Sequence, residues 1–251
     1  MTTSEGSAAT RRVGDAIEIP GNYQFRATYE GSAPQRFWHQ KRFAACLDML
    51  ELGEEMRVLD AGCGSGVFAD LVARHPGTRV TAVDGNPEAI AFARHTYPRS
   101  NLELRRGLVD ELDFAPSAFD RISCLEVIEH IHRDQAKTML STFHRLLRPG
   151  GRLVLSTPNV RSYWPALEWT LDRLHLVPQM EGEQHVDGYD AESLRDLGEG
   201  CGFRHVRTRT LFVLSPWLAV LSWRSAQALH DWEQRIETQL GALLVQSFER
   251  C

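Results

Sequence analysis

The feature that most constrains this chain is an alternation that begins at Arg57, where short β-rich apolar runs are separated by helical stretches. Strands joined by helices are typical of a mostly parallel sheet with helices on its faces. We expect strands at 57–61, 79–84, 102–107, 119–126 and 151–158, and helices at 67–75, 87–95 and 134–147. The alternation therefore predicts an α/β fold around a parallel sheet.

The segments that flank this alternation define the predicted domain organisation. Residues 1–31 are polar and aperiodic, which indicates a flexible N-terminal tail or an arm that orders late, and residues 32–251 are expected to form one domain. Its first helix is expected to open at Ser32, with Pro34 just inside it. Insertions at about 160–188 and 215–240 are expected to form a helical cap over the substrate, the second as one long helix from about Trp217 to Leu240. A helix at 191–200 and strands at 203–214 and 241–249 complete the prediction.

Composition excludes several classes of protein. The chain has 251 residues and a formal net charge of −5, so binding of nucleic acid through bulk positive charge is not expected. The five cysteines are scattered and form no C-x-x-C pair, which is typical of reduced thiols. With no signal peptide and no apolar run long enough to cross a membrane, we expect a cytoplasmic protein, for which peripheral membrane contact remains open.

A glycine-rich turn after the first expected strand points to a ligand. Asp60 precedes Gly62, Cys63, Gly64 and Gly66, and glycines at such a turn let a ligand lie against bare backbone. A dinucleotide fingerprint would need a sixth-position glycine, where this chain has Val67. The carboxylate would also repel a pyrophosphate but attract a cationic amino acid moiety. S-adenosylmethionine carries an ammonium and a sulfonium, and no phosphate.

The run from Asp60 to Gly66 resembles the first motif, D-x-G-C-G-x-G, of the class I S-adenosylmethionine-dependent methyltransferases. The run RVTAVDGNPEAI is similar to their second motif, with Asp84 at the strand end to accept the ribose hydroxyls and Asn86 opening a helix. The resemblance implies a Rossmann-like seven-stranded sheet, mostly parallel with an antiparallel last strand, plus helical cap insertions. It implies S-adenosyl-L-methionine held by Asp60, Gly62, Cys63, Gly64, Gly66, Asp84, Gly85, Asn86, Val109 and Leu125.

The third cofactor position departs from the family pattern. Where relatives commonly carry an acid for the adenine amino group, this chain has Leu108 and Val109. Two readings stay open: adenine is held by apolar and backbone contacts, or Asp110 takes the part of the acid.

The fourth expected strand leads into Glu126, Glu129 and His130, spaced to share one face of a helical turn. This E-x-x-E-H string resembles quinone-biosynthesis O-methyltransferases and small-RNA 2′-O-methyltransferases, which implies a divalent Mg, Mn or Zn ion with His185 as a fourth ligand. The alternative is a metal-independent site in which His130 is the general base. His39 is a further candidate for the mouth of the same site.

We therefore expect an enzyme that methylates a small, aromatic or apolar acceptor, at oxygen, because the expected cap is rich in Trp, Tyr and Leu. Methylation of an RNA 3′-end is an alternative, which the acidic charge balance disfavours. A catalytically silent S-adenosylmethionine-binding subunit is another. The apolar stripe at 215–240 is expected to pack on its own domain; a homodimer contact, a substrate wall and an interfacial membrane helix are the alternatives.

Overall fold

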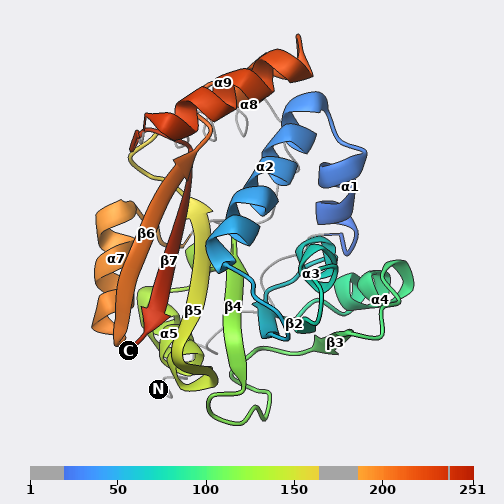
Figure 1. Cartoon of the computed structure of the whole chain (residues 1–251), viewed down its shortest axis with the longest axis vertical. Helices are drawn as coiled ribbons and strands as arrows, with labels where there is room; N and C mark the ends of the chain where they lie inside the picture. The colour runs from blue at the N-terminus through green and yellow to red at the C-terminus, as the bar shows by residue number, and fades with distance from the viewer. Residues whose placement is uncertain (1–19, 164–185, 237) are drawn as a thin grey trace, which may run out of the picture.

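The structure is a computed structural model, and it describes residues 20–163, 186–236 and 238–251. Within these ranges seven strands form one sheet in the order β3-β2-β1-β4-β5-β7-β6 (Figure 1). The strands are β1 (Arg57–Ala61), β2 (Arg79–Asp84), β3 (Leu102–Arg106), β4 (Phe119–Leu125), β5 (Leu147–Pro158), β6 (Phe203–Leu211) and β7 (Leu243–Arg250). The strands predicted from the sequence are thus confirmed, with small shifts at their ends.

The strand directions match the Rossmann-like methyltransferase sheet that the motifs implied. Strand β1 pairs in parallel with β2 and β4, β3 pairs in parallel with β2, and β5 pairs in parallel with β4. The last strand, β7, runs antiparallel between β5 and β6. The carboxyl ends of β1, β2 and β4 consequently meet at one edge of the sheet, which is where ligands bind in open α/β sheets.

Helices cover both faces of the sheet (Figure 1). On one face lie α2 (Ala33–Leu50), α3 (Val67–Ala73) and α4 (Pro87–Thr96); on the other lie α5 (Arg133–Leu146) and α7 (Ala191–Gly200). Successive strand residues separate the two cores, because side chains alternate across a sheet. Val58, for example, belongs to the core under α2, and Leu59 belongs to the core under α5.

The prediction of a flexible tail through residue 31 is wrong for residues 20–31. Helix α1 (Tyr23–Tyr29) lies in this stretch and packs beside α2 (Figure 1). Ala27 and Thr28 are buried, and Phe25 and Phe92 of α4 form an edge-to-face ring pair with centroids 5.3 Å apart. These tertiary contacts stabilise the helix, and no apolar periodicity in the sequence predicted it. Residues 1–19 lie outside the described ranges.

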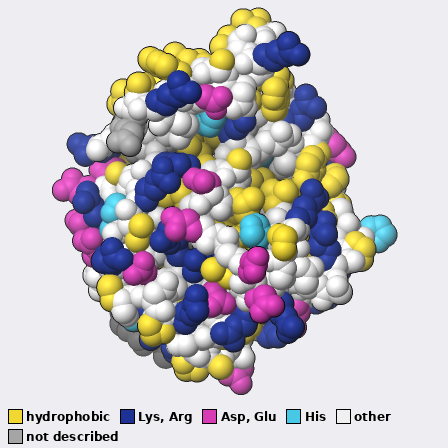
Figure 2. Space-filling view, viewed as in Figure 1, with side chains coloured by type: hydrophobic (Ala, Val, Ile, Leu, Met, Phe, Trp, Pro, Cys, Tyr) yellow, Lys and Arg dark blue, Asp and Glu magenta, His cyan; other side chains and the backbone are white. Residues whose placement is uncertain are grey.

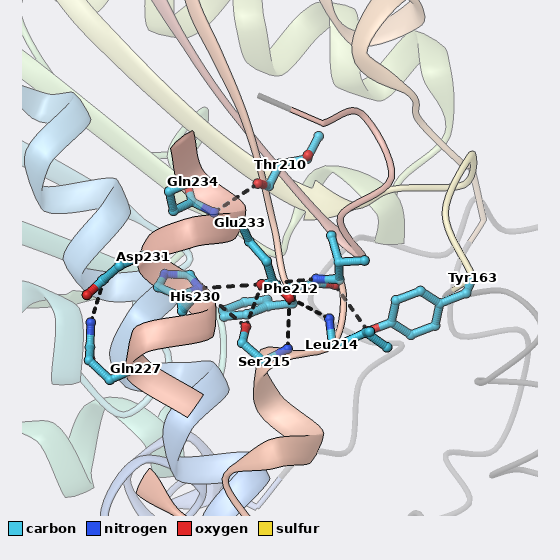
Figure 3. A network of polar contacts seen from close by, with 11 residues as sticks. Tyr163, Thr210, Phe212, Leu214, Ser215, Gln227, His230, Asp231, Glu233 and Gln234 are labelled. Carbon is cyan, nitrogen blue, oxygen red and sulfur yellow. Dashed lines mark hydrogen bonds and ion pairs between the residues drawn. The ribbon is translucent and has the colours of Figure 1, made fainter. Parts of the chain in front are cut away.

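The C-terminal cap consists of α8 (Ser215–Leu218) and α9 (Trp223–Arg235) rather than one continuous helix. Ser222 interrupts them, because its side chain accepts a hydrogen bond from the Ser225 amide and so starts a new helix. Glu233 joins the two helices: its carboxylate accepts hydrogen bonds from the amides of Leu214 and Ser215 and from the Ser215 hydroxyl (Figure 3). A buried carboxylate therefore closes the amino end of α8.

The cap packs on its own domain, but the expectation that the apolar stripe at 215–240 makes this contact is wrong for Leu221, Trp232, Ile236 and Leu240, which are exposed. The Phe37 ring on α2 makes an edge-to-face contact with Trp223, and Trp38 stacks on Phe212 with centroids 4.2 Å apart. The outward side exposes large apolar side chains, namely Leu214, Trp217, Val220, Leu221, Trp232, Ile236 and Leu240. In Figure 2 apolar side chains gather at this end of the molecule. A dimer contact, a substrate wall or a membrane contact here stays a prediction.

Most of the other expected cap insertion, 160–188, lies outside the described residues, which resume at Val186. Within the described ranges, no helix combines the length and the apolar character that crossing a bilayer requires.

Candidate active site

The glycine turn between β1 and α3 has a backbone that side chains would disfavour. Gly62, Gly64 and Gly66 have φ angles of +75°, +53° and +79°. The amide of Gly62 donates to the carbonyl oxygen of Val83 at 2.8 Å, which ties the turn to β2. A Cβ atom on Gly62 would lie 2.4 Å from Cγ2 of Val127, so the turn also lies directly against the segment that follows β4.

Asp84 holds this turn from the end of β2. Its Oδ2 accepts a hydrogen bond from the Gly64 amide at 2.7 Å, and its Oδ1 accepts one from the Asn86 amide at 2.8 Å. Burial raises the pKa of Asp84, while these two hydrogen bonds oppose the rise. Each carboxylate oxygen has a second lone pair, so both oxygens can still accept a hydroxyl proton.

Asp60, at the end of β1, is buried with one oxygen unused. Its Oδ1 accepts a hydrogen bond from the Ser123 hydroxyl at 2.7 Å, whereas Oδ2 has no hydrogen-bond partner among the described residues. Burial raises the pKa of Asp60 to about 7. A buried carboxylate oxygen without a partner is costly in free energy, and a cationic ligand group would relieve that cost.

A cavity of about 200 Å³ extends from the turn along the ends of β1 to β4. Its lining includes Gly62, Asp84, Gly85, Val109 and, against expectation, Cys124 rather than Leu125, which packs in the core. Also lining it are Ala61, Val83, Gly107, Leu108, Asp110, Val127, Ile131, Gln135, Thr138 and Met139. Both sets of residues considered for adenine therefore face the same cavity.

The remaining residues of the predicted cofactor set belong to the glycine turn or to the start of α4. Cys63 is buried, and burial raises the pKa of its thiol well above the ordinary value, which makes it an unreactive small residue. Asn86 is the N-cap of α4, where its side-chain oxygen accepts hydrogen bonds from the amides of Glu88 and Ala89. Gly66 begins α3 at a left-handed φ.

Helix α1 covers the turn from outside, a contact that the sequence analysis missed. The Phe25 amide donates a hydrogen bond to Oγ of Ser65 at 2.9 Å. The side-chain oxygen Oε1 of Gln24 lies 3.5 Å from where a Cβ of Gly64 would be, and it has no hydrogen-bond partner within the described part of the chain. Gln24 thus faces the bare backbone of the turn, where a cofactor would come against it.

The acids after β4 lie beside this turn but not on one helical face. Glu126 has a left-handed backbone with φ +57°, and the short 3-10 helix η2 (Ile128–His130) starts two residues later. The expectation that Glu126, Glu129 and His130 share one helical turn is therefore wrong, because the chain changes direction at Glu126. Oε1 of Glu126 instead accepts a hydrogen bond from the Ser156 hydroxyl of β5 at 2.7 Å.

Glu129 and His130 differ in their access to solvent. The Glu129 side chain is 3% exposed and that of His130 is 14% exposed, and His130 Nε2 lies 4.0 Å from Oε1 of Glu129. Burial, and then the charge of Glu126, raise the pKa of Glu129 well above the ordinary value. His130 is therefore the more accessible of the two groups for an acceptor.

The expected metal site does not fit the described residues. Within the ranges that the structure describes, no group of three His, Cys, Asp or Glu side chains is arranged to hold an ion. The Arg42 guanidinium instead lies beside Glu126, with 3.6 Å between Nη1 and Oε2, and a resident cation there would repel a divalent ion. The fourth expected ligand, His185, lies outside the described residues. His39, the further candidate for the mouth of the site, lies on α2, with its Nδ1 3.2 Å from Nη2 of Arg42.

Comparison with known proteins identifies the class that this fold and turn define. A family model described as a methyltransferase domain matches residues 36–208. The chain belongs to this methyltransferase family, and it is a class I S-adenosylmethionine-dependent methyltransferase.

Two known proteins are similar to this chain in amino-acid sequence. A protein of Mycolicibacterium smegmatis named as a probable S-adenosylmethionine-dependent methyltransferase is 29% identical over 186 residues, which cover 72% of this chain and 70% of the relative. A ubiquinone biosynthesis O-methyltransferase of Xylella fastidiosa is 42% identical over 106 residues, which cover 41% of this chain and 42% of the relative. The match to this second protein thus spans less than half of its length.

Solved structures share the fold. An N-methyltransferase of Bradyrhizobium japonicum in complex with S-adenosylhomocysteine has a TM-score of 0.59 at 20% identity, covering 92% of this chain and 99% of the other. A cyclopropane synthase of Mycobacterium tuberculosis has a TM-score of 0.60 at 15% identity, covering 88% and 87%. The names of these two proteins describe different reactions, so the fold by itself leaves the acceptor undecided.

Proposed function

We propose that this enzyme transfers the methyl group of S-adenosylmethionine to an oxygen atom of a small, apolar or aromatic acceptor such as a quinol. The observation that carries the proposal is the position of His130 and its neighbouring acid Glu129 after β4, in the segment whose Val127 touches Gly62 of the turn. The partial match to ubiquinone biosynthesis O-methyltransferases supports the acceptor class.

In this proposal the cofactor lies along the cavity from the turn to β3. The ammonium of its amino acid end would pair with the unused oxygen of Asp60, and its ribose hydroxyls would donate to Asp84. Adenine would then lie against Leu108 and Val109, in the apolar part of the lining. Gln24 of α1 would cover the methionine end.

The chemical step needs a base and a direction of attack. His130 would accept the proton of the acceptor hydroxyl while the oxygen lone pair attacks the methyl carbon. The bond between that carbon and sulfur breaks, its electron pair returns to sulfur, and the sulfonium charge is neutralised. The products are a methyl ether and S-adenosylhomocysteine, and His130 later releases its proton to water. The protein's contribution is alignment and removal of the proton.

Methyl transfer from labelled S-adenosylmethionine tests the acceptor class. The panel should hold quinols and catechols, primary amines of similar size, and a short single-stranded RNA. We expect label in the hydroxyl compounds, and loss of most of that turnover in His130→Ala with unchanged affinity for S-adenosylhomocysteine. His132→Ala is a matched control, because His132 is the N-cap of α5, two residues further along the chain.

Other results of the same experiment would identify the alternatives. Label in RNA alone would replace the small-molecule proposal, although on the face shown in Figure 2 basic and acidic side chains are interspersed rather than gathered by sign. Label in amines alone would move the reaction from oxygen to nitrogen. Cofactor binding without label in any of a wide set of acceptors would favour the silent binding subunit.

A further inference from the structure

A buried arginine stands among the acids at the carboxyl end of the sheet. Arg42 comes from the middle of α2, and its side chain is 5% exposed. One guanidinium nitrogen lies 3.6 Å from Oε2 of Glu126, and the other terminal nitrogen lies 3.2 Å from Nδ1 of His39. The guanidinium also stacks over the Phe43 ring, with Cζ 4.7 Å from the ring centroid.

The described residues do not satisfy all hydrogen-bond donors of this guanidinium. Its Nε is buried without a hydrogen-bond partner among the described residues, and the same holds for Oε2 of Glu129 and Oδ2 of Asp60. Buried polar atoms are normally paired, and an exception in a native structure asks for an explanation. Here the exceptions gather where the cofactor and the acceptor are proposed to meet.

The acids in this region need a positive charge to stay ionised. Asp60 and Glu129 are buried and Glu126 is partly buried, and carboxylates held together in a poorly hydrated place take up protons unless a counter-charge lies beside them. In methyltransferases with a metal at such a motif, that charge would be a divalent ion. In this chain the guanidinium already contacts Glu126, it stays charged at any working pH, and it is fixed by stacking on Phe43.

We infer that Arg42 supplies the fixed positive charge that a divalent cation would otherwise supply beside Glu126 and Glu129, so that this methyltransferase holds no metal at the end of β4. Arg42 is then a positioning residue: it orients Glu126, which Ser156 holds from the other side. The inference deepens the proposed function, and it rests on that proposal for its activity readout alone.

Manganese binding tests the inference without any acceptor. Mn²⁺ alone is titrated into the full chain and followed by calorimetry and electron paramagnetic resonance. We expect no Glu126-dependent binding in the wild type or in Arg42→Lys, which keeps the charge. In Arg42→Gln, which removes the positive charge beside Glu126 and Glu129, we expect weak Mn²⁺ binding through these two carboxylates to appear, and the added substitution Glu126→Gln should remove it. Arg209→Gln is the matched control, because Arg209 lies on β6, away from the cofactor turn, and pairs there with Asp48 of α2.

Two outcomes would overturn the inference. One is Mn²⁺ binding by the wild type that Glu126→Gln abolishes, which would mean that the acids hold a metal despite Arg42. The other is a folded Arg42→Gln variant that binds no Mn²⁺. If Arg42→Gln does not fold, the wild-type titration with and without Glu126→Gln still decides.

Activity gives a separate check once an acceptor is known. Chelation should leave wild-type turnover unchanged, and Arg42→Lys should retain clearly more turnover than Arg42→Gln, in which we expect a loss of about tenfold or more. Wild-type turnover that chelation abolishes and Mg²⁺ restores would contradict the inference. If every acceptor in the panel fails, the proposed function fails, but the manganese result stands independently.

Discussion

The Gly64 amide donates a hydrogen bond to Oδ2 of Asp84 at 2.7 Å, across 20 residues of sequence. This bond joins the turn after β1 to the end of β2, so the two motifs that were recognised separately form one structure. The same carboxylate that would accept the ribose hydroxyls also fixes the backbone against which the methionine part would lie.

Replacing Asp84 should therefore weaken cofactor binding through two routes. We expect Asp84→Asn to bind S-adenosylhomocysteine about tenfold to a hundredfold more weakly, since hydrogen bonds to charged groups contribute roughly 1.5 to 3 kcal/mol. Calorimetry measures the affinity, and a thermal melt shows whether the variant is folded. Glu88→Gln should bind normally, because Glu88 is exposed at the start of α4. Wild-type affinity in folded Asp84→Asn would refute the ribose assignment.

The contact between the turn and the segment after β4 predicts a coupled pair of substitutions. Gly62→Ala should destabilise the fold by roughly 1–2 kcal/mol from its left-handed backbone alone, and by more because the new methyl would meet Val127. Adding Val127→Ala should recover the steric part and leave the backbone part. Urea unfolding of the two single variants and the double variant measures this coupling. Strictly additive effects would mean that the two residues do not constrain each other.

The raised pKa of Asp60 predicts a pH dependence of cofactor affinity. Burial holds that pKa at about 7 in the cofactor-free protein, but pairing with an ammonium needs the charged carboxylate. Affinity for S-adenosylhomocysteine should thus rise by up to about tenfold per pH unit as pH approaches 7 from below, and level off above it. Calorimetry at several pH values measures the slope, which Asp60→Asn should flatten. An equal slope in that variant would assign the proton to another group.

The raised pKa of Asp60 has the opposite pH dependence in the stability of the folded protein. The folded-state pKa of Asp60 lies above the value of about 3.9 for an unfolded chain, so folding favours the protonated form. The stabilising contribution is complete below about pH 4 and is lost as pH rises through about 7. Asp60→Asn should consequently gain stability relative to the cofactor-free wild type at alkaline pH, as urea unfolding would show.

The cap should depend on Glu233. Its buried carboxylate receives the Leu214 and Ser215 amides at 2.7 and 3.0 Å, and Glu233→Ala would leave both without a partner. We expect a loss of about 3 kcal/mol, since each unsatisfied buried group costs roughly 1–3 kcal/mol. Asp231→Ala is the control: Asp231 is exposed on the same helix, so the change should be within about 0.5 kcal/mol. Equal effects in unfolding experiments would contradict the bridging role of Glu233.

Much of the fold was predictable because its determinants are local. Strands β1 and β2 end at Ala61 and Asp84, where the sequence analysis placed them, because a glycine follows each of these two residues. Helix α7 begins at the predicted Ala191, because Asp190 caps it and Ser193 completes the reciprocal pair of hydrogen bonds. Gly62, Gly64 and Gly66 mark a turn that other residues would strain.

The sequence by itself determined the class of protein, because a strand, a glycine turn and an acid at the end of the next strand are short-range patterns. Together they are typical of S-adenosylmethionine-dependent methyltransferases. The tertiary structure decided what surrounds them. The Phe25 amide donates a hydrogen bond to Ser65, which lies 40 residues further along the chain. Arg42, on a helix that precedes the glycine turn, pairs with Glu126, which follows that turn. No periodicity encodes such pairs, since they depend on how α1 and α2 pack on the sheet. The positive charge beside the acids after β4 therefore became visible only when the chain was folded.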